Sequence, residues 1–178
     1  MAGLRLYRLD AQSIWDDEAF SMVTSRLSAR EMTARLVQDF VHPSLYQYAL
    51  HWWFRIFGFG AFHAKVLSVV FGFAAVGMIY WLGSLIFGKR TGLIAALLLA
   101  VSQLGITYSQ EICSFAMTMC VSIFVTILFC LALRRRMKLF WLGFLLSAAL
   151  LIYLHYVGGL SVACLFCYAL LARTPYSI

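Results

Sequence analysis

Five long apolar runs follow residue 65, and they constrain the fold more than any other feature of the chain. They lie at residues 66–87, 91–108, 114–133, 139–155 and 157–172, separated by short polar connections. A helix needs about 17–25 mostly apolar residues to cross the hydrocarbon core of a bilayer, so the last two runs are short for a full crossing. The sequence predicts an all-α polytopic membrane protein with about five transmembrane helices.

The distribution of charge indicates how these helices are oriented. Charged residues make up only 12% of the chain, and the net charge is +7. The basic residues after Lys65 fall in alternate connections only: Lys89, Arg90, Arg134, Arg135, Arg136, Lys138 and Arg173. The positive-inside rule makes those connections cytoplasmic. We therefore expect a multi-pass protein of the plasma (bacterial inner) membrane. No basic face with interleaved exposed aromatic residues occurs, so no nucleic-acid partner is predicted.

The same orientation divides the chain into three parts. Residues 1–65 carry six of the seven acidic residues and no run long enough to span, so they are expected to form an extracytoplasmic loop with interfacial helices. Residues 66–172 are expected to form a transmembrane helix bundle, and residues 173–178 a cytoplasmic tail. A translocated loop without a signal peptide or a preceding span predicts a missing upstream span and a truncated chain.

Two segments of the loop are predicted to lie on the membrane surface. Ser28 and Glu31 have the spacing of a capping box, and Met32, Leu36 and Phe40 then recur every four residues along one helical face. Residues 45–57 are rich in aromatic side chains, which is typical of a helix at headgroup depth.

The acidic residues are the first candidates for chemistry. Adjacent carboxylates at Asp16, Asp17 and Glu18 follow an aromatic residue and could supply a general base. The alternative is an ordinary helix start, where acidic side chains favour the amino-terminal dipole. Glu111 is the only acidic residue after Asp39 and lies at a span end on the extracytoplasmic side, where a lone charge favours a functional role.

Three segments, residues 1–65, 107–114 and 155–159, share the extracytoplasmic face and are expected to form one site. Besides the acids, they contribute His42, which precedes a proline, and His155 with Tyr156, which end a span. A lone histidine or tyrosine in such a place is also typical of an ordinary interfacial residue.

The order of these elements resembles the GT-C superfamily of membrane glycosyltransferases, especially the bacterial relatives of protein O-mannosyltransferases and lipid A aminoarabinose transferases. The resemblance covers the chain as the amino-terminal part of such an enzyme. The family's Ser-x-Trp-x-Asp-Glu-Ala and Tyr-Ser-Gln-Glu motifs occur intact at residues 13–19 and 108–111. The family's His-Pro-Pro-Leu-Tyr corresponds to His-Pro-Ser-Leu-Tyr at 42–46, its Arg-x-x-Ser-x-x-x-Gly to Lys65, Ser68 and Gly72, and its Thr-His-Tyr to Leu-His-Tyr at 154–156.

The resemblance implies an inverting, mannosyltransferase-like transfer of a sugar from a polyprenyl-phosphate donor to a lipid, glycan or protein acceptor, with membrane lipid around the site. It assigns the general base to Asp17 and an orienting role to Glu18. Glu111 could position the acceptor or an arginine, or help to bind a divalent cation. A metal requirement varies across the superfamily, so no metal or other cofactor is assigned. The implied substrate-binding residues are His42, Lys65, Tyr108, Gln110, His155 and Tyr156.

The chain also departs from the family pattern. The family often continues Ser-Gln-Glu-Ala-Arg-Pro-Tyr, whereas residues 112–115 read Ile-Cys-Ser-Phe and lack the arginine. Lys65 replaces an arginine, which keeps the charge but loses the planar fork. Two alternatives therefore stay open: a non-catalytic membrane fragment, and a small transporter-like subunit. A transporter would need ionisable residues near the middle of its spans, and almost none occur there.

Overall fold

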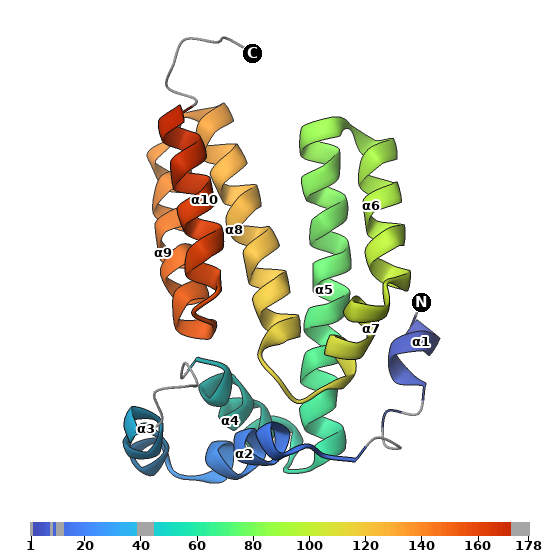
Figure 1. Cartoon of the computed structure of the whole chain (residues 1–178), viewed down its shortest axis with the longest axis vertical. Coiled ribbons are helices and arrows are strands. Elements are labelled where there is room, and N and C mark those ends of the chain that lie inside the picture. The colour runs from blue at the N-terminus through green and yellow to red at the C-terminus, as the bar shows by residue number, and fades with distance from the viewer. Residues whose placement is uncertain (1, 8, 10–12, 39–44, 172–178) are drawn as a thin grey trace.

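The computed structural model describes residues 2–7, 9, 13–38 and 45–171, and these form ten helices and no strand. Figure 1 shows a bundle of long helices with a layer of short helices across one of its ends. The predicted all-α class is confirmed.

The apolar runs form the long helices of the bundle. Two of them, α5 and α8, are long and apolar enough to cross a membrane, and a third crossing arises if the bent pair α6 and α7 is one span. The helices α9 and α10 are apolar but shorter. Their bounds are Ala61–Phe87 (α5), Lys89–Val101 (α6), Gln103–Gln110 (α7), Phe115–Arg135 (α8), Lys138–Leu154 (α9) and Gly158–Leu171 (α10).

The second predicted span, residues 91–108, is broken rather than continuous. Helices α6 and α7 meet at Ser102 with a bend of 57°. The Ser102 hydroxyl oxygen accepts a hydrogen bond from the Gly105 backbone N–H at 3.0 Å, so Ser102 caps α7 as a new helix. A capping serine inside an apolar run is a local signal for such a break.

Small residues let α5 pack closely on α6. A Cβ atom at Gly83 would lie 2.8 Å from the Cα atom of Gly92, a distance too short for any larger side chain. Such close approach through small residues is common between membrane helices, where packing replaces the hydrophobic effect as the driving force. Gly88 makes the turn between the two helices with a φ of +94°, which favours glycine.

The two ends of the bundle differ in character. The α5–α6 and α8–α9 connections, which carry Lys89, Arg90 and residues 134–138, lie at one end, and the short helices lie at the other (Figure 1). The short helices are α2 (Asp16–Arg26), α3 (Ala29–Gln38) and α4 (Leu45–Phe57). A further helix, α1 (Ala2–Leu6), packs beside α7.

The predicted amphipathic segments form α3 and α4. The capping box at the start of α3 is confirmed, because the Glu31 carboxylate accepts hydrogen bonds from the Ser28 backbone N–H at 3.1 Å and from the Ser28 hydroxyl at 2.7 Å. Met32 and Leu36 are buried, whereas Phe40 lies outside the described residues. In α4 the buried residues Tyr46, Leu50 and Phe54 join a core cluster with residues of α2, α5 and α9, while Trp52 is 62% exposed.

Candidate active site

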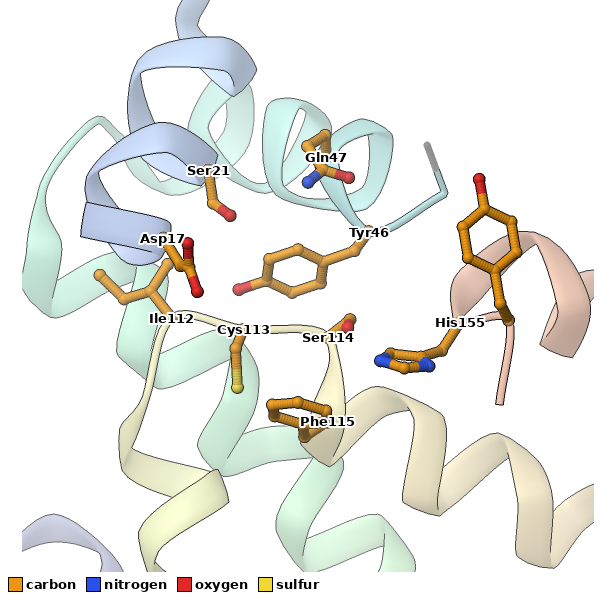
Figure 2. Close-up of a pocket in the computed structure, with 10 residues that line it drawn as sticks. Asp17, Ser21, Tyr46, Gln47, Ile112, Cys113, Ser114, Phe115 and His155 are labelled. Atoms are coloured by element: carbon orange, nitrogen blue, oxygen red, sulfur yellow. The ribbon is translucent and has the colours of Figure 1, made fainter. Parts of the chain in front are cut away.

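A cavity of about 270 Å³ lies where the layer of short helices meets the bundle. Figure 2 shows side chains from α2, α4, the α7–α8 connection and the α9–α10 connection converging on it. The structure thus brings together the three segments that the sequence predicted to share one site. The cavity is lined by Asp17, Ser21, Tyr46, Gln47, Ile112, Cys113, Ser114, Phe115, His155 and Tyr156.

Glu18 fixes α2 in its place beside the cavity. One oxygen of its carboxylate accepts a hydrogen bond from the Trp15 backbone N–H at 3.0 Å, which caps the first turn of α2. The other oxygen accepts a hydrogen bond from the Ile112 backbone N–H at 2.6 Å, across to the α7–α8 connection. Because the Glu18 side chain is only 5% exposed, both bonds are shielded from water. Glu18 is therefore held by two hydrogen bonds, of which the bond from Trp15 is that of a helix start. Its role in the reaction stays a prediction.

Asp17 is left free by this arrangement. Its carboxylate lines the cavity, its residue is exposed, and it makes no hydrogen bond within the described part of the chain. Figure 2 shows it pointing into the space beside Tyr46 and Cys113. A carboxylate that has no other partner and faces a cavity open to water can accept a proton from a bound hydroxyl.

Glu111 lies between α7 and α8, next to the cavity but outside its lining. Partial burial, and then the negative charge of Glu18, raise the pKa of Glu111 above its ordinary value. The neighbouring Cys113 thiol donates to the Glu111 carboxylate at 3.8 Å, and burial raises the pKa of Cys113 to about 12. This thiol is therefore protonated at neutral pH.

The raised pKa of Glu111 predicts a pH-dependent contribution to stability. The folded chain binds the Glu111 proton more tightly than the unfolded chain, so ionisation of this group opposes folding as pH rises through its folded pKa. We expect Glu111→Gln to raise the thermal unfolding midpoint in detergent at pH 7, and the gain to disappear as the pH falls toward the unfolded value of 4.5.

Glu31→Gln is the matched control for this prediction. Hydrogen bonds from Ser28 lower the pKa of Glu31, so ionisation of Glu31 favours the folded chain above its unfolded pKa. The Glu31→Gln midpoint should therefore not exceed that of the unmodified chain at pH 7. A gain for Glu111→Gln that stays constant from pH 7 to 4.5 would contradict the assignment.

His155 and Tyr156 enter the cavity from the end of α9. The Nδ1 atom of His155 accepts a hydrogen bond from the Val157 backbone N–H at 3.2 Å, so the neutral ring carries its proton on Nε2. The ring centroids of His155 and Phe115 are 5.4 Å apart, and those of Phe115 and Tyr108 are 4.8 Å apart. This aromatic row packs against the His155 ring, which lines the cavity.

Three of the other predicted substrate-binding residues, Lys65, Tyr108 and Gln110, do not line this cavity. The Lys65 ammonium is 2% exposed and donates to the Leu9 carbonyl at 3.0 Å, and the Gln110 amide donates to the carbonyls of Arg5 and Tyr7, both at 3.2 Å. Both side chains thus hold the amino-terminal segment. Tyr108 lines an apolar groove between α7 and α8. His42 lies outside the described residues. The substrate-binding roles of all four residues stay predictions.

Several residues that line the cavity were not predicted from the sequence. Ser21, Tyr46, Gln47 and Cys113 line the cavity, and only Tyr46 carried a signal, since it ends the His-Pro-x-Leu-Tyr motif. Arg5 was also missed. Its side chain is fully buried and holds α1 against the α6–α7 bend.

The lining of the cavity contains a carboxylate and several neutral polar groups but no lysine or arginine among the described residues. Within the same residues, no three His, Cys, Asp or Glu side chains gather in a geometry that could hold a metal ion. The arrangement suits proton transfer from, and hydrogen bonding to, a neutral ligand.

The structure is a helical membrane bundle with a cavity at one end, where the helix that carries the acidic residues meets the bundle. Residues 41–177 match the family model of the dolichyl-phosphate-mannose-protein mannosyltransferases. The chain therefore belongs to this family. The matched range includes Lys65, residues 108–111 and His155, whereas Asp17 and Glu18 precede it. No curated protein and no solved structure matches the chain significantly.

Proposed function

We propose that this glycosyltransferase moves a sugar from a polyprenyl-phosphate donor to a hydroxyl group of a lipid, glycan or protein acceptor, with inversion at the anomeric carbon. The observation that carries the proposal is the free Asp17 carboxylate in a cavity at the junction of the bundle and the short helices. A donor with a prenyl chain in the bilayer would present its phosphate at this depth. Membership in the mannosyltransferase family supports a lipid-linked sugar as donor.

The proposed reaction is a single displacement. The Asp17 carboxylate takes the proton of the acceptor hydroxyl. At the same time the oxygen of that hydroxyl attacks the anomeric carbon of the donor sugar. The bond between that carbon and the phosphate oxygen breaks, and the electron pair leaves with the prenyl phosphate. Attack from the face opposite the phosphate inverts the anomeric configuration. The Nε2–H of His155 is the donor at the cavity wall that could stabilise the developing charge.

We further propose that the cavity faces the periplasm or the exterior. The connections that carry Lys89, Arg90 and residues 134–138 lie at the opposite end of the bundle (Figure 1). Under the positive-inside rule that end is cytoplasmic. Glu18 acts in this proposal as the positioning residue of the base, because its two hydrogen bonds fix the first turn of α2.

The proposal is tested by a transfer assay in membranes. Vesicles that contain the protein are supplied with radiolabelled polyprenyl-phosphate mannose and with protein, lipid or glycan acceptors. We expect label to pass to one acceptor class, and the product to have the anomeric configuration opposite to that of the donor. Transfer with retention would overturn the displacement, and the absence of transfer to any acceptor would overturn the function.

A further inference from the structure

A second cavity, of about 330 Å³, lies in the layer of short helices at the end of α2 that is remote from Asp17. Two arginines line it: Arg26 is the last residue of α2, and Arg55 lies in the last turn of α4. Asp17 and Arg26 are nine positions apart in one helix, so about 14 Å separates them along its axis. The other lining residues belong to α2, α4 and the connections that follow them: Ser25, Leu27, Ser28, His51, Phe54 and Phe59.

Both arginines are available to a ligand. Their side chains are exposed, and neither donates a hydrogen bond or pairs with a carboxylate within the described residues. The Arg26 guanidinium lies 5.0 Å from the centroid of the Phe59 ring, a contact that holds the group and leaves its N–H donors free. Two guanidinium groups at one cavity favour an anion as ligand, because the planar fork of each suits the oxygen atoms of a phosphate.

The charge around the cavity also favours an anion. No aspartate or glutamate lines it in the described part of the chain. Glu31 lies beside the cavity, where its carboxylate accepts hydrogen bonds from the backbone N–H and the hydroxyl of Ser28. The two arginines outnumber this one carboxylate, so the cavity keeps an excess of positive charge.

Hydrogen bonds between α2 and α4 hold the cavity in shape. The Ser25 hydroxyl donates to the Gln47 carbonyl at 3.1 Å, and the Nδ1 atom of His51 donates to the Ser25 carbonyl at 2.9 Å. Ser25 and His51 are buried, so both bonds are shielded from water. The turns that carry Arg26 and Arg55 are thereby fixed relative to each other, which lowers the entropy cost of binding a ligand that contacts both.

The neighbouring surface indicates the source of the anion. Trp52 lies one turn from both Arg55 and Ile56 on the same side of α4, and Trp52 and Ile56 are exposed. Phe59, in the lining of the cavity, is exposed as well. Exposed aromatic and aliphatic side chains beside arginines are typical of a helix at the headgroups of a bilayer. The phosphate of a membrane lipid is therefore the anion that this surface meets.

We propose that Arg26 and Arg55 form a site for the headgroup phosphate of an anionic membrane phospholipid, which anchors the end of α2 opposite Asp17. The two guanidinium groups bind the phosphate, and the exposed aromatic side chains contact the glycerol and the acyl chains. The inference does not depend on the proposed reaction, because this cavity is separate from the cavity at Asp17.

Native mass spectrometry tests the site without turnover. The protein is incubated in detergent with equal amounts of a phosphatidylglycerol and a phosphatidylcholine that have the same acyl chains. We expect one phosphatidylglycerol to bind in preference to phosphatidylcholine. Arg26→Met and Arg55→Met should each weaken this binding at least about tenfold in apparent affinity, the change expected for the loss of a charged hydrogen-bond donor.

Arg30→Met is the matched control for both substitutions. Arg30 is also exposed and lies in the first turn of the neighbouring α3, but it does not line the cavity. Its substitution removes the same charge and should leave the binding of phosphatidylglycerol unchanged. Equal losses in all three variants, or equal affinity of the unmodified chain for the two lipids, would overturn the site.

Thermal unfolding in detergent distinguishes a lipid headgroup from a free phosphate. Phosphatidylglycerol should raise the unfolding midpoint of the unmodified chain more than that of Arg55→Met, and inorganic phosphate at the same concentration should raise neither. Stabilisation by inorganic phosphate that Arg55→Met abolishes would assign the cavity to a soluble phosphate and overturn the lipid as its ligand.

The same measurement separates a ligand-binding role from a structural one. Because Arg55 makes no hydrogen bond or ion pair within the described residues, Arg55→Met should leave the midpoint of the lipid-free protein unchanged. A midpoint lowered as much without lipid as with it would make Arg55 a structural residue and overturn its role in the site.

Discussion

Asp17→Asn is expected to lower the rate of sugar transfer by at least about a hundredfold, the lower end of the usual contribution of a general base. Asparagine has nearly the same shape as aspartate but cannot take the proton of the acceptor hydroxyl. Asp17 makes no hydrogen bond within the described residues, so the substitution should leave membrane insertion and the unfolding midpoint unchanged. Initial rates in membranes with radiolabelled donor measure the effect.

Asp16→Asn is the matched control for this substitution. Asp16 is the preceding residue, is also exposed and lies in the same first turn of α2, but it does not line the cavity. Any general effect of removing a negative charge from the start of α2 should appear in both variants. Full transfer activity in Asp17→Asn would remove Asp17 as the base, and equal losses in both variants would point to the charge of the helix terminus instead.

Arg5→Met is expected to give the largest loss of stability among single substitutions in the amino-terminal segment. The fully buried Arg5 guanidinium donates to the Ser109 hydroxyl and to the Ala100 carbonyl, both at 3.1 Å. The carbonyls of Leu99 and Gly105 lie at 3.5 Å. Methionine fills a similar space but donates nothing, so the acceptors at the α6–α7 bend are left unpaired.

Each buried acceptor left without a donor costs about 1–3 kcal/mol. The unfolding midpoint in detergent should therefore fall by on the order of 5 °C for a chain of this size. The unfolding midpoint of Arg5→Lys should lie between those of the unmodified chain and Arg5→Met. An ammonium keeps the charge, but it lacks the planar fork with which the guanidinium reaches several acceptors. Arg30→Met, at an exposed arginine of α3, is the control and should have little effect. An Arg5→Met midpoint equal to that control would show that the bend is stable without Arg5.

Much of the architecture could be predicted because membrane insertion depends on local sequence. The length of an apolar run fixes a helix, as in α5 and α8, and the spacing of Ser28 and Glu31 fixes the start of α3. The break at Ser102 was not predicted. The residues on both sides of Ser102 are apolar, so the mean hydropathy of residues 91–108 indicates one continuous helix although the serine caps a new one.

The partners of the polar side chains could not be predicted in the same way. Glu18 and Arg5 bond to residues 94 and 104 positions away, and no local pattern specifies which carbonyl or N–H a buried charge will find. The family motif at residues 65–72 pointed to Gly72 but not to the residues that it contacts. Within it, Gly72 proves to be the residue that makes room on α5 for Ser109 and Arg5, since a Cβ atom there would lie 2.9 Å from the Ser109 Cβ atom.

The long sequence separation of these bonds has a consequence for synthesis of the chain. The bonds of Arg5 to Ser109 and of Glu18 to Ile112 form only after α7 and the connection after it have been made. These long-range bonds therefore form last, after the segment that carries Asp17 has been translated and α5 and α6 have been inserted. A chain stalled after α6 would lack the cavity, because the connections that complete its lining come later, and Arg5 and Glu18 would each lack one of their partners, Ser109 and Ile112.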